Sequence, residues 1–146
     1  MYTSDQLARR NASPLTGAMM AASMLQLLVI IASYCFVVYY LSAGGGYTGA
    51  LITFWLNIAL LWVNTIIGML WEKEVYGHYF MCREFFWEDV GNLAALIAYN
   101  SYFVVLLAGW TQHGVAVLML VANTVYLINF AQFVVKLMRA RKQQRR

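Results

Sequence analysis

Four apolar runs, each long enough to cross a lipid bilayer, constrain this chain more than any other feature. They cover residues 18–41, 51–71, 90–109 and 114–135. A helix needs about 20 apolar residues to cross a hydrocarbon core of about 30 Å, and it makes all of its backbone hydrogen bonds within one segment. The chain is also 11% charged, whereas soluble domains are about 25% charged. We therefore predict an all-α fold, an integral membrane four-helix bundle that forms a single domain over residues 1–146.

The basic residues predict the orientation of this bundle. All ten Lys and Arg residues precede the first run, separate the second from the third, or follow the fourth. With four spans these places share one side of the membrane, which the positive-inside rule identifies as cytoplasmic. We expect both termini there, with a cytoplasmic interfacial segment at 72–89 and a basic tail at 136–146. The tail either only determines topology, which is the simpler interpretation, or also binds anionic lipid or a partner.

Residues 71–89, with the sequence WEKEVYGHYFMCREFFWED, hold five of the six acidic residues and seven aromatic ones. We expect Gly77 to interrupt any helix there. Aromatic residues beside Glu72, Glu88 and Asp89 indicate carboxyl groups held against apolar surface. Such surroundings raise the pKa of a carboxyl group and let it keep a proton near neutral pH. The same residues are also typical of an interfacial aromatic belt with acids at a helix start, and composition alone favours that interpretation.

Amide side chains within the apolar runs predict a polar bundle interior, because amides facing lipid are costly. Asn57 and Asn64 are seven residues apart on one helix face, and Asn92 follows Glu88 by four. We expect the same inward orientation for Gln26, Asn123, Asn129 and Gln132. Hydrogen bonding between helices is the simpler role for these amides, and direct contact with a ligand is the alternative.

Several other kinds of site do not fit the sequence. His78 and His113 lie outside the runs at opposite ends, so they do not form the facing pairs of a haem-binding bundle. There is no phosphate-binding glycine loop, HExxH motif or nucleophile elbow. A basic tail without aromatic stacking platforms does not fit nucleic-acid binding. Cys35 and Cys82 predict neither a disulfide nor a metal motif.

Two motifs resemble the 2-vinyl bacteriochlorophyllide hydratase family of bacteriochlorophyll biosynthesis. The N-terminal YTSDQLARRNAS is similar to that family's opening, YTxEQLARRNAS, and the WEK and FFWED motifs of residues 71–89 are similar to its central signature. The order of spans around the motifs also agrees, so the resemblance covers most of the chain. One departure is the stretch Met81-Cys82-Arg83-Glu84, where family members often have small residues or proline. This difference bears on substrate preference more than on reaction class.

The resemblance implies that water adds to the C3 vinyl group of chlorophyllide a or 3-vinyl bacteriochlorophyllide, giving a 1-hydroxyethyl group. Protonation of the terminal carbon leaves a cation that water attacks, and carboxyl groups can serve as acid and base. The candidates are Glu72 or Glu88 as acid, with Asp89 as base or water-orienting group. Candidate ring contacts are Trp71, Tyr76, Phe85, Phe86 and Trp87, supported by Asn64 and Asn92. Lys73 or Arg83 would pair with the propionate, and His78 either approaches the central magnesium or is polar surface.

The family also implies a location and partners. We expect the protein in a bacterial inner membrane, cytoplasmic or intracytoplasmic and photosynthetic, with a chlorophyllide-type tetrapyrrole as substrate and the lipid bilayer as surroundings. Other enzymes of pigment biosynthesis are further candidate partners. No cofactor, no metal held by the protein and no nucleic acid are expected. Two other classes stay open: a non-catalytic pigment-binding or assembly subunit of a photosynthetic complex, and a structural membrane protein without pigment.

Overall fold

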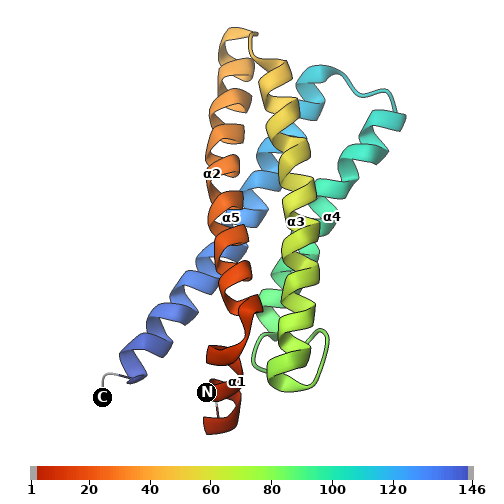
Figure 1. Ribbon diagram of the computed structural model, residues 1–146. Coiled ribbons are helices and arrows are strands. Elements are labelled where there is room, and N and C mark those ends of the chain that lie inside the picture. Colours follow the sequence, from red (N-terminus) through yellow and green to blue (C-terminus); the bar gives the residue numbers. More distant parts are fainter. Residues whose placement is uncertain (1–2, 145–146) are drawn as a thin grey trace.

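The computed structural model describes residues 3–144, with the backbone alone at 136, 137 and 139–144. Within these residues the chain is all-α (Figure 1). Its helices are α1 (Ser4–Ala12), α2 (Pro14–Ala43), α3 (Tyr47–Tyr76), α4 (Phe86–Leu107) and α5 (Gln112–Gln144). The last two basic residues, Arg145 and Arg146, lie outside the described residues, and no side chain of the predicted tail at 136–146 is described except that of Met138.

Four helices are long and apolar enough to cross a membrane, namely α2, α3, α4 and α5 as far as Val135. This confirms the predicted all-α class and its four apolar helices. The helices extend beyond most of the predicted runs because local signals set their ends. Pro14 occupies the first turn of α2 after the Ser13 cap, where its missing N–H costs nothing. Gly44 ends α2 with a φ of 74°, a left-handed conformation that glycine adopts without steric cost.

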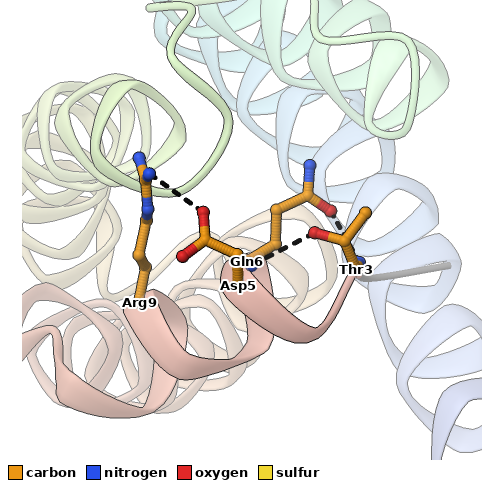
Figure 2. A network of polar contacts seen from close by, with 4 residues as sticks. All are labelled: Thr3, Asp5, Gln6 and Arg9. Carbon is orange, nitrogen blue, oxygen red and sulfur yellow. Dashed lines mark hydrogen bonds and ion pairs between the residues drawn. The ribbon is translucent and has the colours of Figure 1, made fainter.

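The short helix α1 precedes these four and was not predicted. Its start is a capping box in which the Gln6 N–H donates to Thr3 Oγ1 at 3.2 Å and the Thr3 N–H donates to Gln6 Oε1 at 2.9 Å (Figure 2). Arg9 and Asp5, one turn apart, form an ion pair at 2.9 Å. The signal was present in the sequence, because Thr-x-x-Gln is a recognised start motif, but the helix is too short and polar for a hydropathy argument.

Two antiparallel pairs make up the bundle: α2 packs along α3, and α4 packs along α5, which also contacts α2. Residues 108–111 form the short connection between α4 and α5, so these two helices make an antiparallel hairpin. Phe54 and Tyr99 stack at 4.9 Å between ring centroids in the core, with Ile30, Leu61 and Met119 buried around them. Helix α1, the loop at 77–85 and the C-terminal end of α5 all lie at the lower end of the bundle (Figure 1).

The interior is polar as well as apolar, as the amides predicted. Gln26, Asn57, Asn123 and Asn129 are all buried. The Tyr99 hydroxyl donates to Asn123 Oδ1 at 2.6 Å, and Asn123 Nδ2 donates to Ser33 Oγ at 3.0 Å. The predicted inward position of Gln132 is wrong, because its side chain is exposed and lines a groove between α4 and α5.

Candidate functional site

The site begins where α3 ends, at the lower end of the bundle. Gly77 has a φ of 84°, and its N–H donates to the Lys73 carbonyl. It therefore ends the helix as predicted, one turn after Glu72. The chain then returns to α4 through a loop in which Met81 has a φ of 58°. The Met81 N–H donates to Asp89 Oδ2 at 2.8 Å, so the Asp89 carboxylate fixes this strained turn against the start of α4.

The loop closes over a pair of carboxyl groups. Glu72 from α3 and Asp89 from α4 are 6% and 7% exposed. They interact with each other, and Glu72 also hydrogen-bonds the Cys82 thiol. Two carboxylates in contact repel each other when both are charged, which favours one proton shared between them. The pair can therefore accept or release a proton while remaining buried.

Cys82 is buried beside this pair. Burial, followed by the hydrogen bond and negative charge of Glu72, raises the pKa of the Cys82 thiol to about 12. A thiol with that pKa stays protonated near neutral pH, and the thiolate is the nucleophilic form. Cys82 therefore acts as a neutral hydrogen-bonding neighbour of Glu72.

Glu88 occupies a different surface from its neighbour Asp89, since successive helical residues point about 100° apart. It lines a groove of about 650 Å³ between the start of α4 and α5. Phe86 and Trp87 line the same groove and are 44% and 72% exposed. Arg83 and Glu84 line it from the loop, and Ile128, Ala131, Gln132 and Val135 line it from α5. The groove thus combines an apolar wall, exposed aromatic rings and a largely buried carboxyl group.

An amide from α5 supports the turn that carries Glu88. With its amide oriented to suit its neighbours, Asn129 donates to the Glu88 carbonyl and accepts from the Asn92 N–H, each at 3.2 Å. This approach requires a glycine at position 91, because a Cβ there would lie 2.2 Å from a terminal atom of the Asn129 amide. Sequence reasoning assigned no role to Gly91. A glycine in the first turns of a helix, beside acidic residues, is only a weak signal of such close packing.

The five aromatic residues predicted to contact a ring separate into two groups. Trp71, Tyr76 and Phe85 pack edge-to-face on one another at 5.6–6.0 Å. The Trp71 indole N–H also donates to Thr16 Oγ1 of α2 at 2.9 Å. These three rings thus join the ends of α2, α3 and α4, whereas Phe86 and Trp87 present exposed ring surface at the groove.

The other predicted contacts lie apart from the groove, with one exception. Lys73 Nζ donates to the Tyr79 hydroxyl at 2.6 Å, and His78 lies in the exposed loop beside a smaller pocket of about 380 Å³. Two amides bridge helices: Asn64 to Gln26 at 2.6 Å and Asn92 to Thr65 at 3.0 Å. Arg83 is the exception, because it lines both the groove and the smaller pocket.

Comparison of the chain with known proteins assigns it to a family. The model of the 2-vinyl bacteriochlorophyllide hydratase family matches residues 2–139. The chain belongs to this family. A curated family member from Rhodobacter capsulatus is 35% identical over 143 residues, which are 98% of this chain and 84% of that protein. A second, from Cereibacter sphaeroides, is 36% identical over 142 residues, which are 97% of this chain and 88% of that protein. Both carry the name 2-vinyl bacteriochlorophyllide hydratase.

Membership of the hydratase family assigns the reaction class. A hydratase is a carbon–oxygen lyase, so the protein is an enzyme, and the predicted resemblance is confirmed. Four apolar helices agree with a multi-pass membrane protein in this family. No solved structure matches the chain.

Proposed function

We propose that the chain adds water to the C3 vinyl group of chlorophyllide a or 3-vinyl bacteriochlorophyllide, giving the 3-(1-hydroxyethyl) product in bacteriochlorophyll biosynthesis. The observation that carries this proposal is the groove between α4 and α5, which joins exposed aromatic rings to the Glu88 carboxyl group. Family membership supplies the reaction class, and the names of the two curated relatives supply the type of substrate.

The groove suits a flat, largely apolar ring with one carboxylate. Its volume of about 650 Å³ falls within the range of about 300–1,000 Å³ found for small-molecule pockets. Phe86 and Trp87 offer ring faces for the macrocycle, and Arg83 offers a guanidinium group for the propionate. An open groove on the side of the bundle also lets a pigment enter from the membrane.

The carboxyl groups divide the proton transfers between them in this proposal. Glu88 faces the groove, so it delivers a proton to the terminal vinyl carbon, leaving a cation delocalised into the macrocycle. Water then bonds to the carbon next to the ring and loses a proton, which solvent carries to the buried Glu72–Asp89 pair because neither of these carboxyl groups lines the groove. Glu88 regains a proton and the pair releases one before the next turnover. One proton is given and one is taken, so the addition is balanced and needs no electron carrier.

We also infer that the lower end of the bundle in Figure 1 is cytoplasmic. Helix α1, the loop at 77–85 and the end of α5 lie there together, and the basic residues of the described part of the chain, from Arg9 to Lys142, belong to these segments or to the adjacent end of α3. Basic residues are concentrated on cytoplasmic ends of membrane helices. The groove would then meet substrate at the cytoplasmic surface of a bacterial inner membrane.

The test is a hydratase assay on membranes that contain the full chain. Membranes are incubated with a vinyl chlorophyllide, and the product is identified by the added mass of one water molecule. We expect Glu88→Gln to lower kcat by about 100-fold or more, which is the usual contribution of a general acid, while pigment binding measured by absorbance is retained. Glu84→Gln is the matched control, because Glu84 lines the same groove from the loop and has no assigned proton transfer.

Two results would contradict the proposal in different ways. If Glu72→Gln, Glu88→Gln and Asp89→Asn each keep full activity, the assignment of the carboxyl groups is wrong. If the unmodified chain binds pigment and never hydrates it, the protein is a pigment-binding subunit.

A further inference from the structure

Gln132 is a polar side chain on the otherwise apolar α5 wall of the groove. It lines the groove together with Ile128, Ala131 and Val135, and a spacing of three or four residues puts all four on one stripe of the helix. Its side chain is exposed, and no hydrogen bond or ion pair joins it to another residue within the described part of the chain. An amide among apolar side chains costs free energy unless a polar group binds it.

Gln132 lies across the groove from Glu88 at nearly the same depth. The ring of Phe133, the next residue, packs against that of Phe85 at 6.2 Å between centroids, so Gln132 is level with the residue just before α4. Glu88 follows Phe85 by three residues, which is about 4.5 Å along the axis at 1.5 Å per residue. Helical side chains lean toward the N-terminus of their own helix. Because α4 and α5 are antiparallel, the side chains of Glu88 and Gln132 lean toward each other's level.

We propose that the Gln132 amide binds the water molecule that attacks the pigment. A vinyl group placed for protonation by Glu88 lies between these two side chains, and a hydrocarbon group offers the amide no hydrogen bond. Water does, and it is available because Gln132 is within one turn of Val135, where the fourth span ends. Gln132 Oε1 accepts from one O–H of this water, which turns a lone pair of the water oxygen toward the carbon next to the ring.

This role rests on the proposed function and follows its bond changes. The π electrons of the vinyl group form a C–H bond with the proton from Glu88, the bound water forms the C–O bond, and one water proton leaves to solvent. An amide is neutral and does not take up that proton, which agrees with its removal by solvent. Water held on one side of the planar cation also selects one configuration at the new carbinol carbon.

The experiment is hydration of a vinyl chlorophyllide in heavy water by membranes that contain the full chain. Glu88 then delivers deuterium to the terminal carbon. The resulting cation has two fates: it bonds water and gives product, or it loses a proton and returns vinyl pigment that carries deuterium. The ratio of labelled vinyl pigment to product therefore measures how well the water is held, separately from how well the proton is delivered.

Gln132→Met keeps the length of the side chain and removes the amide. It should lower kcat by about 10-fold, the size of one hydrogen bond lost from the transition state, and raise the labelling ratio by a similar factor. The KM for pigment should not change, because the amide contacts water and not the ring. The two carbinol configurations, separated by chromatography, should approach equal amounts.

Two further variants complete the test. Gln112→Met makes the same substitution at the other end of α5 and should match the unmodified chain. Gln132→Glu keeps a hydrogen-bond acceptor at the same length and should keep the low labelling ratio. A raised KM with an unchanged labelling ratio in folded Gln132→Met would show that the amide binds the ring, and would overturn the role in holding water. An unmodified chain that neither hydrates nor labels the pigment would overturn the proposed function and this role together.

Discussion

Replacing Gly91 with alanine tests how the turn that carries Glu88 is held. The new Cβ would lie 2.2 Å from a terminal atom of the Asn129 amide, 2.8 Å from its Cγ and 3.3 Å from its Cβ. Three successive atoms of one side chain are therefore too close, and rotation of the terminal amide cannot relieve all of them. Asn129 must leave the α4 backbone and give up its bonds to the Glu88 carbonyl and the Asn92 N–H.

The expected loss of stability follows from three contributions. A buried amide without partners costs about 1–3 kcal/mol. Forcing a methyl group into a packed interface costs about 1–3 kcal/mol more. Alanine is better than glycine in a helix by about 1 kcal/mol, which offsets part of this. The net decrease in the free energy of unfolding should therefore be about 1–5 kcal/mol.

The assay is unfolding of the purified protein in mixed detergent micelles, followed by circular dichroism, together with hydratase activity. Gly17→Ala is the control, because an added Cβ there meets nothing within 4 Å, and it should be neutral or stabilising. Gly91→Ala combined with Asn129→Ala removes the collision but not the loss of hydrogen bonds, so it should recover part of the stability. If Gly91→Ala is as stable as Gly17→Ala, the close contact between Asn129 and α4 is refuted.

Two further predictions concern the loop and the groove. A pKa of about 12 instead of 9.0 leaves the Cys82 thiol about a thousandfold less ionised near pH 8 than an ordinary cysteine. The thiolate is the form that reacts with maleimide. Maleimide labelling of Cys82 should therefore be slow in the folded protein and fast after denaturation, and fast labelling of the folded chain would contradict the buried contact with Glu72. Trp87→Ala should raise the KM for pigment and leave the free energy of unfolding within about 0.5 kcal/mol, as expected for an exposed side chain; an unchanged KM would exclude Trp87 from ring binding.

Much of the fold was predictable because hydropathy is averaged over a whole membrane span. The four apolar helices, the stop at Gly77 and the inward amides at Asn57 and Asn123 follow from residue types with strong physical preferences. The exact helix ends do not, because α3 continues for more than a turn beyond its apolar run. Helix α1 was missed since capping, and not hydropathy, determines it.

The candidate site was harder to predict because it depends on which surfaces meet. Residue type alone does not distinguish an aromatic side chain that packs in the core from one that faces a ligand. Trp71 and Phe85 are buried against each other, whereas Phe86, the next residue, is exposed at the groove. Gln132 was misplaced for the same reason, since an amide in an apolar run suits either the interior or the wall of an open groove.

Adjacent residues of the FFWED motif lie in different surroundings at the start of α4. Successive helical residues turn by about 100°, so three neighbours at the start of α4 meet three different surroundings. Trp87 is mostly exposed, Glu88 lies in the groove wall, and Asp89 lies under the loop beside Glu72. Adjacent carboxyl groups thus differ in their access to a bound ring, although sequence spacing treats them as equivalent. This difference in position, and not the identity of the acid, is what assigns proton delivery to Glu88 and proton removal to the buried pair in the proposed reaction.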